Sequence, residues 1–508
     1  MNFKQEKRGR QTMSIFEKTR QSVDLKQEGA NKMKKGLSFK EKYSYGIGAI
    51  GKDMCCGIIF TYCMLYFTDV LRLSASFVGT LFFLAKFWDA VNDLGMGMIV
   101  DNTHTRWGKF RPWLAIGTII NAVVLVCLFT NWNLSGTALY IFAAVMYVVW
   151  GMTYTIMDIP YWSMLPNLSS DPVERDKISV IPRIFASIGG SLLVGGFGMQ
   201  IMDFLGKGNA QDGFTRFAWL IAIVFIVTVG ITVVNVRSAD QTDIQTQEKT
   251  SFRQLVRTIK GNDQLIVAIL TILTFNFAIN CILGAQTYYF IYVAGSKNMF
   301  SVFTMFAAFA EIFGLIIFPK MAKRMSKTQV YSLASIIPTF GLIVLLVAGI
   351  VAPQSYLLTA IAGICVRLGS GLQLGTVTVM LADVVDYGEY KLGTRNESVI
   401  FSIQTLLVKF SSAVGALFTG FALDMTGYVP DAVQSAATLN GIRIIMIGLP
   451  IIFVLLSFFI YKTYYKLNTS NMTEILNFLS QKRARGGILQ EATLEVQEKQ
   501  GGLYDDLV

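Results

Sequence analysis

The sequence predicts an all-α polytopic membrane protein whose twelve helices form two bundles of six. Three observations support this fold class. Of the 508 residues, 53% are hydrophobic and only 15% are charged, whereas soluble proteins average about 25% charged residues. The mean hydropathy of the chain is +0.50. Apolar runs of about 20 residues, the length that spans a bilayer, recur along most of the chain.

Twelve apolar runs follow one another in the sequence, and each is long enough for a spanning helix. Several are longer than a bilayer requires and contain glycines, so we expect those helices to tilt or break. The predicted spans are residues 44–70, 77–100, 112–131, 137–165, 179–205, 214–236, 263–294, 299–322, 328–350, 354–386, 397–426 and 440–463.

Hydrophilic stretches divide the chain into five predicted units. A basic start without the apolar core of a cleavable signal peptide predicts a disordered cytoplasmic arm, within which Met33 is an alternative start. The polar end of the chain contains one short helical candidate near 473–481. The units are the arm (1–42), an N-terminal six-helix bundle (43–236), a central cytoplasmic loop (237–262), a C-terminal six-helix bundle (263–464) and a cytoplasmic tail (465–508).

The net charge of +11 arises from 44 basic and 33 acidic residues. The basic residues lie mainly in the two ends and in the loops after even-numbered spans, whereas loops 131–136 and 351–356 carry no charge. Positive loops stay in the cytoplasm, so we expect both termini there, in the plasma (inner) membrane of a bacterium. Orientation in the lipid bilayer explains this charge, and no nucleic-acid partner is expected.

Several classes of chemistry are disfavoured by the sequence. There is one histidine, His104, and six scattered cysteines without metal-ligand spacing. Neither a phosphate-binding loop nor a dinucleotide fingerprint occurs, which argues against ATP-driven transport by this chain alone. We therefore expect no enzymatic activity, no cofactor other than a coupling ion, and no obligate protein partner.

Four carboxylates of the first half lie within predicted spans: Asp53, Asp89, Asp93 and Asp158. Each aspartate at the centre of a membrane helix costs about 3 kcal/mol on insertion scales, so these side chains should face an interior cavity. The alternative is that these carboxylates form internal ion pairs whose role is purely structural, holding helices together. The basic candidates for such pairing are Lys86, Arg183 and Lys409.

Asp89 and Asp93 lie one helical turn apart, and Asn92 shares their face. Two carboxylates in this arrangement offer oxygen ligands to Na⁺ or Li⁺, or share a proton. Thr155 on the fourth span is positioned to add a hydroxyl. The spacing predicts a site for a small monovalent cation.

Tyr154, Asp158 and Trp162 recur at i, i+4 and i+8 around Pro160, which can bend the helix. A carboxylate accepts hydrogen bonds from several hydroxyls, and an aromatic face covers the C–H side of a pyranose. This pattern indicates sugar binding, completed by Asp53 and Arg183. An interfacial aromatic belt is the alternative explanation for Trp162.

Asp383, Asp386 and Glu389 end the tenth span on one side of the helix. We expect them to pair with loop bases such as Arg175 and so to hold the two halves together on the cytoplasmic side. A solvated helix end explains the same pattern equally well.

Six plus six spans, with a basic loop at the same place in each half, is the major facilitator pattern. With these residues in view, the chain resembles the glycoside–pentoside–hexuronide:cation symporters, and most closely the melibiose permeases, from about residue 42 to 467. The resemblance rests on YSYGIGAIGKD (43–53), WDAVND (88–93), RWGKFRPW (106–113), WGMTYTIMDIP (150–160), DVVDYGEYKL (383–392) and Gln404-Thr405.

This resemblance implies Na⁺, Li⁺ or H⁺ binding at Asp89, Asp93 and Thr155, with Asn92 influencing the choice of cation and Lys409 close by. It also implies a galactoside site. The residues of that site are Lys52, Asp53, Tyr154, Asp158, Trp162 and Arg183.

Two positions depart from the family pattern. Lys86 stands where an arginine is usual, which keeps the charge and loses the planar fork. Leu374 replaces a tryptophan of the tenth span, so the sugar can differ. A β-glucoside, a pentoside or a glucuronide remain alternatives, although a glucuronide should need cavity bases beyond Lys52 and Arg183.

The sequence therefore predicts a secondary active symporter that couples Na⁺ (or Li⁺ or H⁺) entry to uptake of an α-galactoside such as melibiose. Two other classes stay open. One is a non-transporting membrane sensor on a transporter fold, and the other is a lipid transporter.

Overall fold

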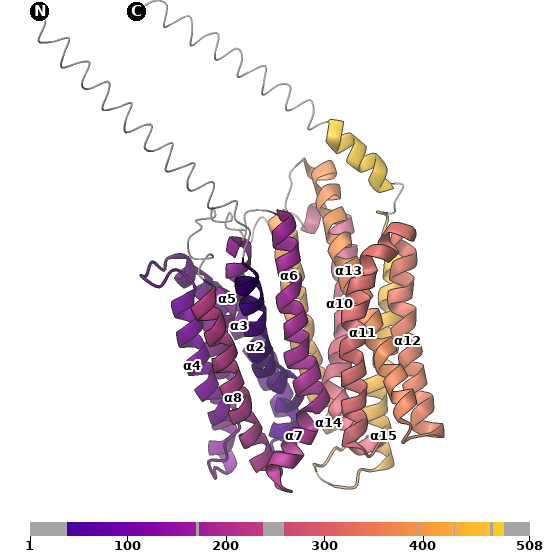
Figure 1. Ribbon diagram of the computed structural model, residues 1–508. Coiled ribbons are helices and arrows are strands. Elements are labelled where there is room, and N and C mark those ends of the chain that lie inside the picture. The colour runs from indigo at the N-terminus through magenta and orange to yellow at the C-terminus, as the bar shows by residue number, and fades with distance from the viewer. Residues whose placement is uncertain are drawn as a thin grey trace, which may run out of the picture.

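Long helices that run roughly side by side make up the computed structural model (Figure 1). It describes residues 38–168, 172–236, 259–393, 397–430, 432–467 and 471–481. Within these ranges every regular element is a helix, as the sequence predicts. Residues 1–37 and 237–258, which hold most of the predicted arm and central loop, lie outside the described ranges.

The N-terminal half consists of six long helical segments. Two of them contain π-helical stretches that continue the α-helix without a loop. The elements are α2 (Phe39–Leu65) with η1 (Tyr66–Val70), α3 (Ala75–Asp101), α4 (Arg111–Leu128), α5 (Gly136–Leu168), α6 (Pro172–Ala186) with η2 (Ser187–Gly196) and α7 (Phe197–Gly206), and α8 (Ala210–Asn235).

The C-terminal half repeats this organisation. Its elements are α10 (Asp263–Tyr288) with η4 (Tyr289–Val293), α11 (Lys297–Arg324), α12 (Lys327–Val351), α13 (Tyr356–Leu392), α14 (Glu397–Met425), and α15 (Ala436–Arg443) with η5 (Ile444–Gly448) and α16 (Leu449–Tyr464). A further helix covers 471–481, where the short tail helix is predicted.

These twelve segments match the twelve predicted spans, and the predicted fold class is confirmed. Eleven of the described segments are long and apolar enough to cross a membrane. The remaining long segment, α3, carries Lys86, Asp89 and Asp93, and with them the predicted cation site.

Polar residues at the ends of the apolar runs fix where the helices begin. The Ser38 side chain accepts a hydrogen bond from the Glu41 backbone N–H at the start of α2. Ser74 caps α3 and Asn262 caps α10 in the same way. Such caps satisfy backbone donors that the first helical turn leaves unpaired.

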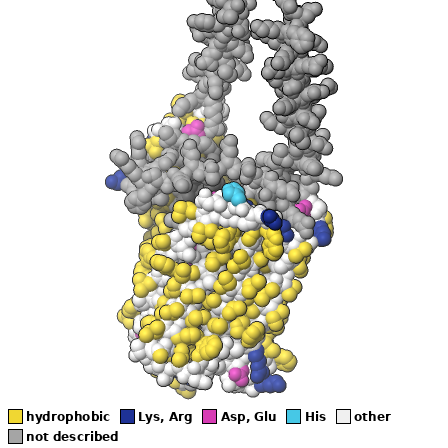
Figure 2. Space-filling view, turned by 90° about the vertical axis from the view of Figure 1, so that its left-hand side faces the viewer, with side chains coloured by type: hydrophobic (Ala, Val, Ile, Leu, Met, Phe, Trp, Pro, Cys, Tyr) yellow, Lys and Arg dark blue, Asp and Glu magenta, His cyan; other side chains and the backbone are white. Residues whose placement is uncertain are grey.

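The outer flank of the bundle is apolar. Figure 2 shows it covered with hydrophobic side chains, whereas charged side chains appear near the two ends. On α4, for example, Ile116, Ile119 and Val123 are each about half exposed. A band of this kind is stable in lipid and unstable in water. The molecule is a multi-pass membrane protein.

The most extensive contacts between the two halves are those of α3 with α14 and of η2 with α11. At the first contact, Gly79 and Gly420 bring the backbones together, and a Cβ at Gly420 would lie 2.4 Å from the Ala75 carbonyl oxygen. We call the end of the bundle where α3 ends the basic end and the opposite one the far end. They are the upper and lower ends in Figure 1.

Candidate functional site

Asp89 and Asp93 of α3 lie against one face of α5. The Thr155 hydroxyl donates a hydrogen bond to Asp93 Oδ1 over 3.0 Å. One turn before Thr155, a Cβ added at Gly151 would lie 2.7 Å from Asp89 Oδ1, so only glycine leaves room for this carboxylate. The one-turn spacing on α3 is therefore matched by the same spacing on α5.

Each of these carboxylates also has a basic neighbour. Lys86 Nζ lies 3.4 Å from Asp89 Oδ2, and Lys409 of α14 forms an ion pair with Asp93. Asn92 donates from Nδ2 to the Met152 carbonyl over 3.4 Å. The structure thus brings together the predicted cation residues, with Lys409 contributed by the other half.

The donor set suits a small hard cation. Asp89, Asp93 and Thr155 offer only oxygen atoms, which Na⁺ and Li⁺ prefer over nitrogen or sulfur. The Lys409 ammonium group already pairs with Asp93, so a cation bound to this carboxylate would compete with Lys409.

Lys52 lies at the centre of the predicted sugar residues of α5. Its side chain is only 4% exposed, and Nζ donates to Asp158 Oδ1 over 2.7 Å and to the Tyr154 hydroxyl over 3.2 Å. The same ammonium group lies 5.1 Å from the centre of the Trp162 ring. The i, i+4, i+8 stripe thus surrounds a buried lysine.

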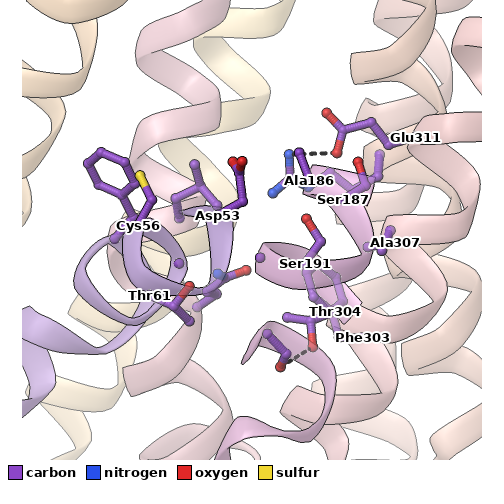
Figure 3. Close-up of a pocket in the computed structure, with 18 residues that line it drawn as sticks. Asp53, Cys56, Thr61, Ala186, Ser187, Ser191, Phe303, Thr304, Ala307 and Glu311 are labelled. Carbon is purple, nitrogen blue, oxygen red and sulfur yellow. Dashed lines mark hydrogen bonds and ion pairs between the residues drawn. The ribbon is translucent and has the colours of Figure 1, made fainter. Parts of the chain in front are cut away.

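Asp53, the next residue, faces a cavity of about 350 Å³ between the two halves. Lys52 Nζ lies 3.4 Å from Asp53 Oδ2, yet this buried oxygen makes no hydrogen bond within the described residues. The hydroxyls of Ser187, Ser191 and Thr304 line the same cavity (Figure 3). A carboxylate and several hydroxyls around one cavity are suited to exchange hydrogen bonds with a polyhydroxylated ligand.

Two predicted positions do not join this group. Arg183 of α6 is exposed, makes no hydrogen bond or ion pair within the described residues, and does not line the cavity. Leu374 of α13 is 40% exposed and likewise lies outside the lining. A role for Arg183 in sugar binding stays a prediction.

Two charged residues that are not among the predicted site residues are Glu311 of α11 and Arg367 of α13. Both line the cavity opposite Asp53, and Arg367 donates to Glu311 Oε2 over 3.3 Å. The sequence does contain a sign of their importance, since both are charged residues within predicted spans. The family motifs concentrate in the first half, however, and neither residue lies in one of them.

A second cavity of about 410 Å³ adjoins the first and shares Phe60, Thr61 and Leu283 with it. Lys86 and Lys409 line this second cavity. The two lysines beside the predicted cation residues therefore line the space that continues from the Asp53 cavity.

The predicted gating carboxylates lie at the basic end, and one of them has a partner other than the expected one. Asp383 accepts hydrogen bonds from Lys327 Nζ over 2.6 Å and from the Tyr465 hydroxyl over 3.1 Å, both within the C-terminal half. The Arg175 side chain lies outside the described residues. Pairing of Asp383, Asp386 or Glu389 across the halves stays a prediction.

At the far end, a cluster absent from the predictions joins the halves. Asp69 of η1 accepts hydrogen bonds from the Tyr292 hydroxyl over 2.5 Å and the Tyr428 hydroxyl over 2.7 Å. Beside it, the Thr68 and Tyr288 hydroxyls lie 2.9 Å apart. Spacing within one helix gives no sign of such contacts between distant segments.

Sequence comparison with known proteins shows the family to which this chain belongs. Residues 44–469 match the model of the family described as MFS/sugar transport protein. The inner membrane symporter YicJ of Escherichia coli (strain K12) is 30% identical over 88% of this chain and 96% of its own length. The isoprimeverose transporter of Lactiplantibacillus pentosus is 29% identical over 82% and 86%.

Solved structures agree on the fold alone. A bacterial homologue of the human lysosomal transporter Spinster, in an inward-facing conformation, has a TM-score of 0.60 at 14% identity and covers 84% of this chain and 97% of its own. The nucleoside transporter NupG has a TM-score of 0.58 at 13% identity, with coverage of 83% and 100%.

The matched residues include α2 to α16, and with them the Asp93 and Asp53 sites. The chain belongs to the MFS/sugar transport family, that of the glycoside–pentoside–hexuronide:cation symporters, and is a transporter of the major facilitator fold.

Proposed function

We propose that the chain is a secondary active symporter that couples the entry of Na⁺ (or Li⁺ or H⁺) to the uptake of a glycoside, with an α-galactoside such as melibiose as the first sugar to test. The observation that carries this proposal is the position of Asp93. It lies where α3, α5 and α14 meet, bonded to Thr155 in its own half and paired with Lys409 of the other half.

A cation that binds Asp89, Asp93 and Thr155 takes the place of Lys409 at Asp93. This exchange removes an ion pair between α14 and α3, the most extensive helix contact between the halves in the described residues. The cation thus alters the contact about which the two halves rock when the central site is exposed to either side in turn.

Helix α5 links the cation to the sugar. Thr155 faces Asp93, while its neighbour Tyr154 and the next-turn residue Asp158 bond Lys52 beside Asp53. A cation that holds Thr155 in place therefore also holds Tyr154 and Asp158, and through Lys52 these two residues position the Asp53 carboxylate. Linkage requires that the sugar tighten cation binding by the same factor, typically about 1–3 kcal/mol of coupling.

Relatives support a glycoside as the substrate. Their names include an isoprimeverose transporter, a lactose permease of Lactobacillus delbrueckii subsp. bulgaricus and a raffinose carrier protein of Pediococcus pentosaceus, each 26% to 29% identical. The cavity hydroxyls and the Asp53 carboxylate suit such sugars and would be poorly matched to an acyl chain.

The membrane orientation is part of the proposal. We infer that the basic end faces the cytoplasm of a bacterium and that both termini lie on that side, because of the loop charges. One cation that enters with an interior-negative potential then supplies roughly 2.3 kcal/mol per 100 mV.

The test is uptake of radiolabelled melibiose, lactose, raffinose and isoprimeverose into proteoliposomes with an inward Na⁺, Li⁺ or H⁺ gradient. We expect at least one sugar to accumulate against its gradient, and accumulation to collapse when the ion gradient is dissipated. Equilibration without accumulation under every gradient would contradict symport.

A further inference from the structure

We propose that the Glu311–Arg367 ion pair is the sugar contact of the C-terminal half, and that it makes the site selective for neutral glycosides over uronides. The inference deepens the proposed function and rests on it. No residue of the sugar site predicted from the sequence lies in that half.

The pair forms the wall opposite Asp53. Figure 3 shows the Glu311 and Asp53 carboxylates across the cavity from one another, with the dashed line from Glu311 marking its bond to Arg367. The Glu311 and Arg367 side chains are 34% and 21% exposed, although both lie within spanning helices. Charged groups at this depth are stable where they face a cavity.

Both members have unused hydrogen-bonding capacity. Arg367 makes one hydrogen bond within the described residues, of 3.3 Å, whereas a guanidinium group carries five N–H donors. Glu311 receives that bond at Oε2 and none at Oε1 within the same residues. An arginine and a carboxylate side by side offer donors and acceptors to adjacent sugar hydroxyls, which both donate and accept.

Helix packing does not require this ion pair. Gly314 and Gly371 already bring α11 and α13 together, and a Cβ at Gly371 would lie 2.4 Å from the Glu311 carbonyl oxygen. These two helices make the most extensive contact in the described structure. A single monodentate pair beside a cavity adds little to such an interface.

The charge balance of the cavity favours a neutral ligand. Among the described residues, its lining carries two carboxylates, Asp53 and Glu311, and one guanidinium group. Lys52, behind Asp53, is shared with Asp158, so these five groups together leave one negative charge in excess. A uronide carboxylate would place a further anion beside Glu311, with Arg367 as the only basic group of the described lining to share between them, which is costly in a partly desolvated site.

The test is calorimetric binding to purified full-length protein of melibiose, lactose, raffinose, isoprimeverose and methyl glucuronide. The variants are Arg367→Gln and the isosteric Glu311→Gln, with Arg216→Gln as matched control. Arg216 also pairs with a carboxylate, Asp212, but is half exposed and far from the cavity. Na⁺ affinity without sugar is measured on every variant.

We expect the wild-type protein to bind a neutral sugar and not the glucuronide. Each cavity variant should lose about tenfold in affinity for the neutral sugar, the effect of one hydrogen bond to a charged group, with unchanged Na⁺ affinity. Glu311→Gln should also narrow the preference for neutral sugar over glucuronide by about tenfold, since it removes the competing anion. Arg216→Gln should bind as the wild-type protein does.

Wild-type affinity for the neutral sugar in both cavity variants would overturn the inference and leave symport intact. A parallel loss of Na⁺ and sugar binding would indicate a clamp between helices and would also overturn it. If the wild-type protein bound the glucuronide more tightly than the neutral sugars, the proposed selectivity for neutral glycosides would be refuted. If no sugar binds the wild-type protein, the proposed function fails and this inference fails with it. If the Arg367→Gln protein does not fold, the sugar affinity of Glu311→Gln alone tests the inference.

Discussion

Asp93 accepts a hydrogen bond from Thr155 and pairs with the ammonium group of Lys409, so it links α5 to the C-terminal half at the proposed cation site. The substitution Asp93→Asn keeps the shape of the side chain and removes its charge. In this variant we expect sugar affinity to become independent of Na⁺, because no charge remains for the cation to neutralise.

The measurement is sugar binding with and without Na⁺. Asp101→Asn serves as control, since it removes a carboxylate at the end of the same helix that pairs with Lys109 and is more than half exposed. Active, Na⁺-driven accumulation by Asp93→Asn would refute the assignment of the cation site.

A second prediction at the scale of the residue concerns Gly151. A methyl group there would lie 2.7 Å from Asp89 Oδ1 and push the carboxylate away from α5. We expect Gly151→Ala to weaken Na⁺ binding about tenfold, equivalent to about 1.4 kcal/mol, in a protein that still folds. Gly97→Ala on α3, where nothing lies within 4 Å, is the control and should bind Na⁺ normally. Equal Na⁺ affinities in the two variants would contradict this role.

Residue spacing predicted part of the site and could not predict the rest. Asp89 and Asp93 were recognisable because helical periodicity places them on one face of a helix, whereas Thr155, on another helix, was proposed as a third ligand with the support of the family resemblance. Lys52 at the centre of Tyr154, Asp158 and Trp162 follows from a contact between α2 and α5, which periodicity does not reveal. Glu311 and Arg367 lie 56 positions apart, and only the packing of α11 on α13 pairs them.

At the scale of the element, α2 positions both Lys52 and Asp53 by close packing on α8. A Cβ at Gly51 would lie 2.5 Å from the Phe225 Cα, so the two backbones touch there. We expect Gly51→Ala to destabilise the protein by about 1–3 kcal/mol through overpacking, and to weaken sugar binding because the neighbouring side chains shift.

Thermal unfolding in detergent, read together with sugar affinity, checks this prediction. Gly230→Ala on α8 is the control, since nothing lies within 4 Å of that Cβ and alanine favours helix by about 1 kcal/mol over glycine. If Gly51→Ala were as stable as Gly230→Ala, the close packing would not be needed.

The helices themselves followed from the sequence, because long apolar runs bounded by polar caps leave few alternatives in a membrane. Where the prediction differs, polar residues extend a helix beyond its apolar core. The tenth span was expected to end at residue 386, yet α13 continues to Leu392 and ends before Gly393, whose φ of 71° suits the left-handed cap. Polar helical turns outside the membrane leave no mark in hydropathy.

At the scale of the whole molecule, the two halves are held together at the far end by hydrogen bonds to Asp69. Burial, and secondarily the Asp69 charge, raises the pKa of Tyr428, so its hydroxyl remains a donor at neutral pH. We expect Tyr428→Phe to increase opening of the far end about fivefold, since one bond of about 1 kcal/mol is lost.

The measurement uses a variant with Cys56 as its only cysteine, because Cys56 lines the cavity beside Asp53. A membrane-impermeant maleimide added from the far side should alkylate it faster in Tyr428→Phe. Tyr356→Phe, which changes an exposed tyrosine at the start of α13, should not alter the rate. Equal rates in all three proteins would show that Asp69 and Tyr428 do not control opening.

The central claim is that cation and sugar bind with positive coupling in one molecule. Isothermal titration calorimetry of purified protein tests it most directly, with melibiose, lactose, a xyloside and a glucuronide titrated with and without Na⁺, and Na⁺ titrated with and without sugar. We predict that a neutral sugar binds, that Na⁺ tightens it about tenfold, and that the sugar tightens Na⁺ by the same factor. Sugar binding that neither Na⁺, Li⁺ nor pH alters would contradict the account.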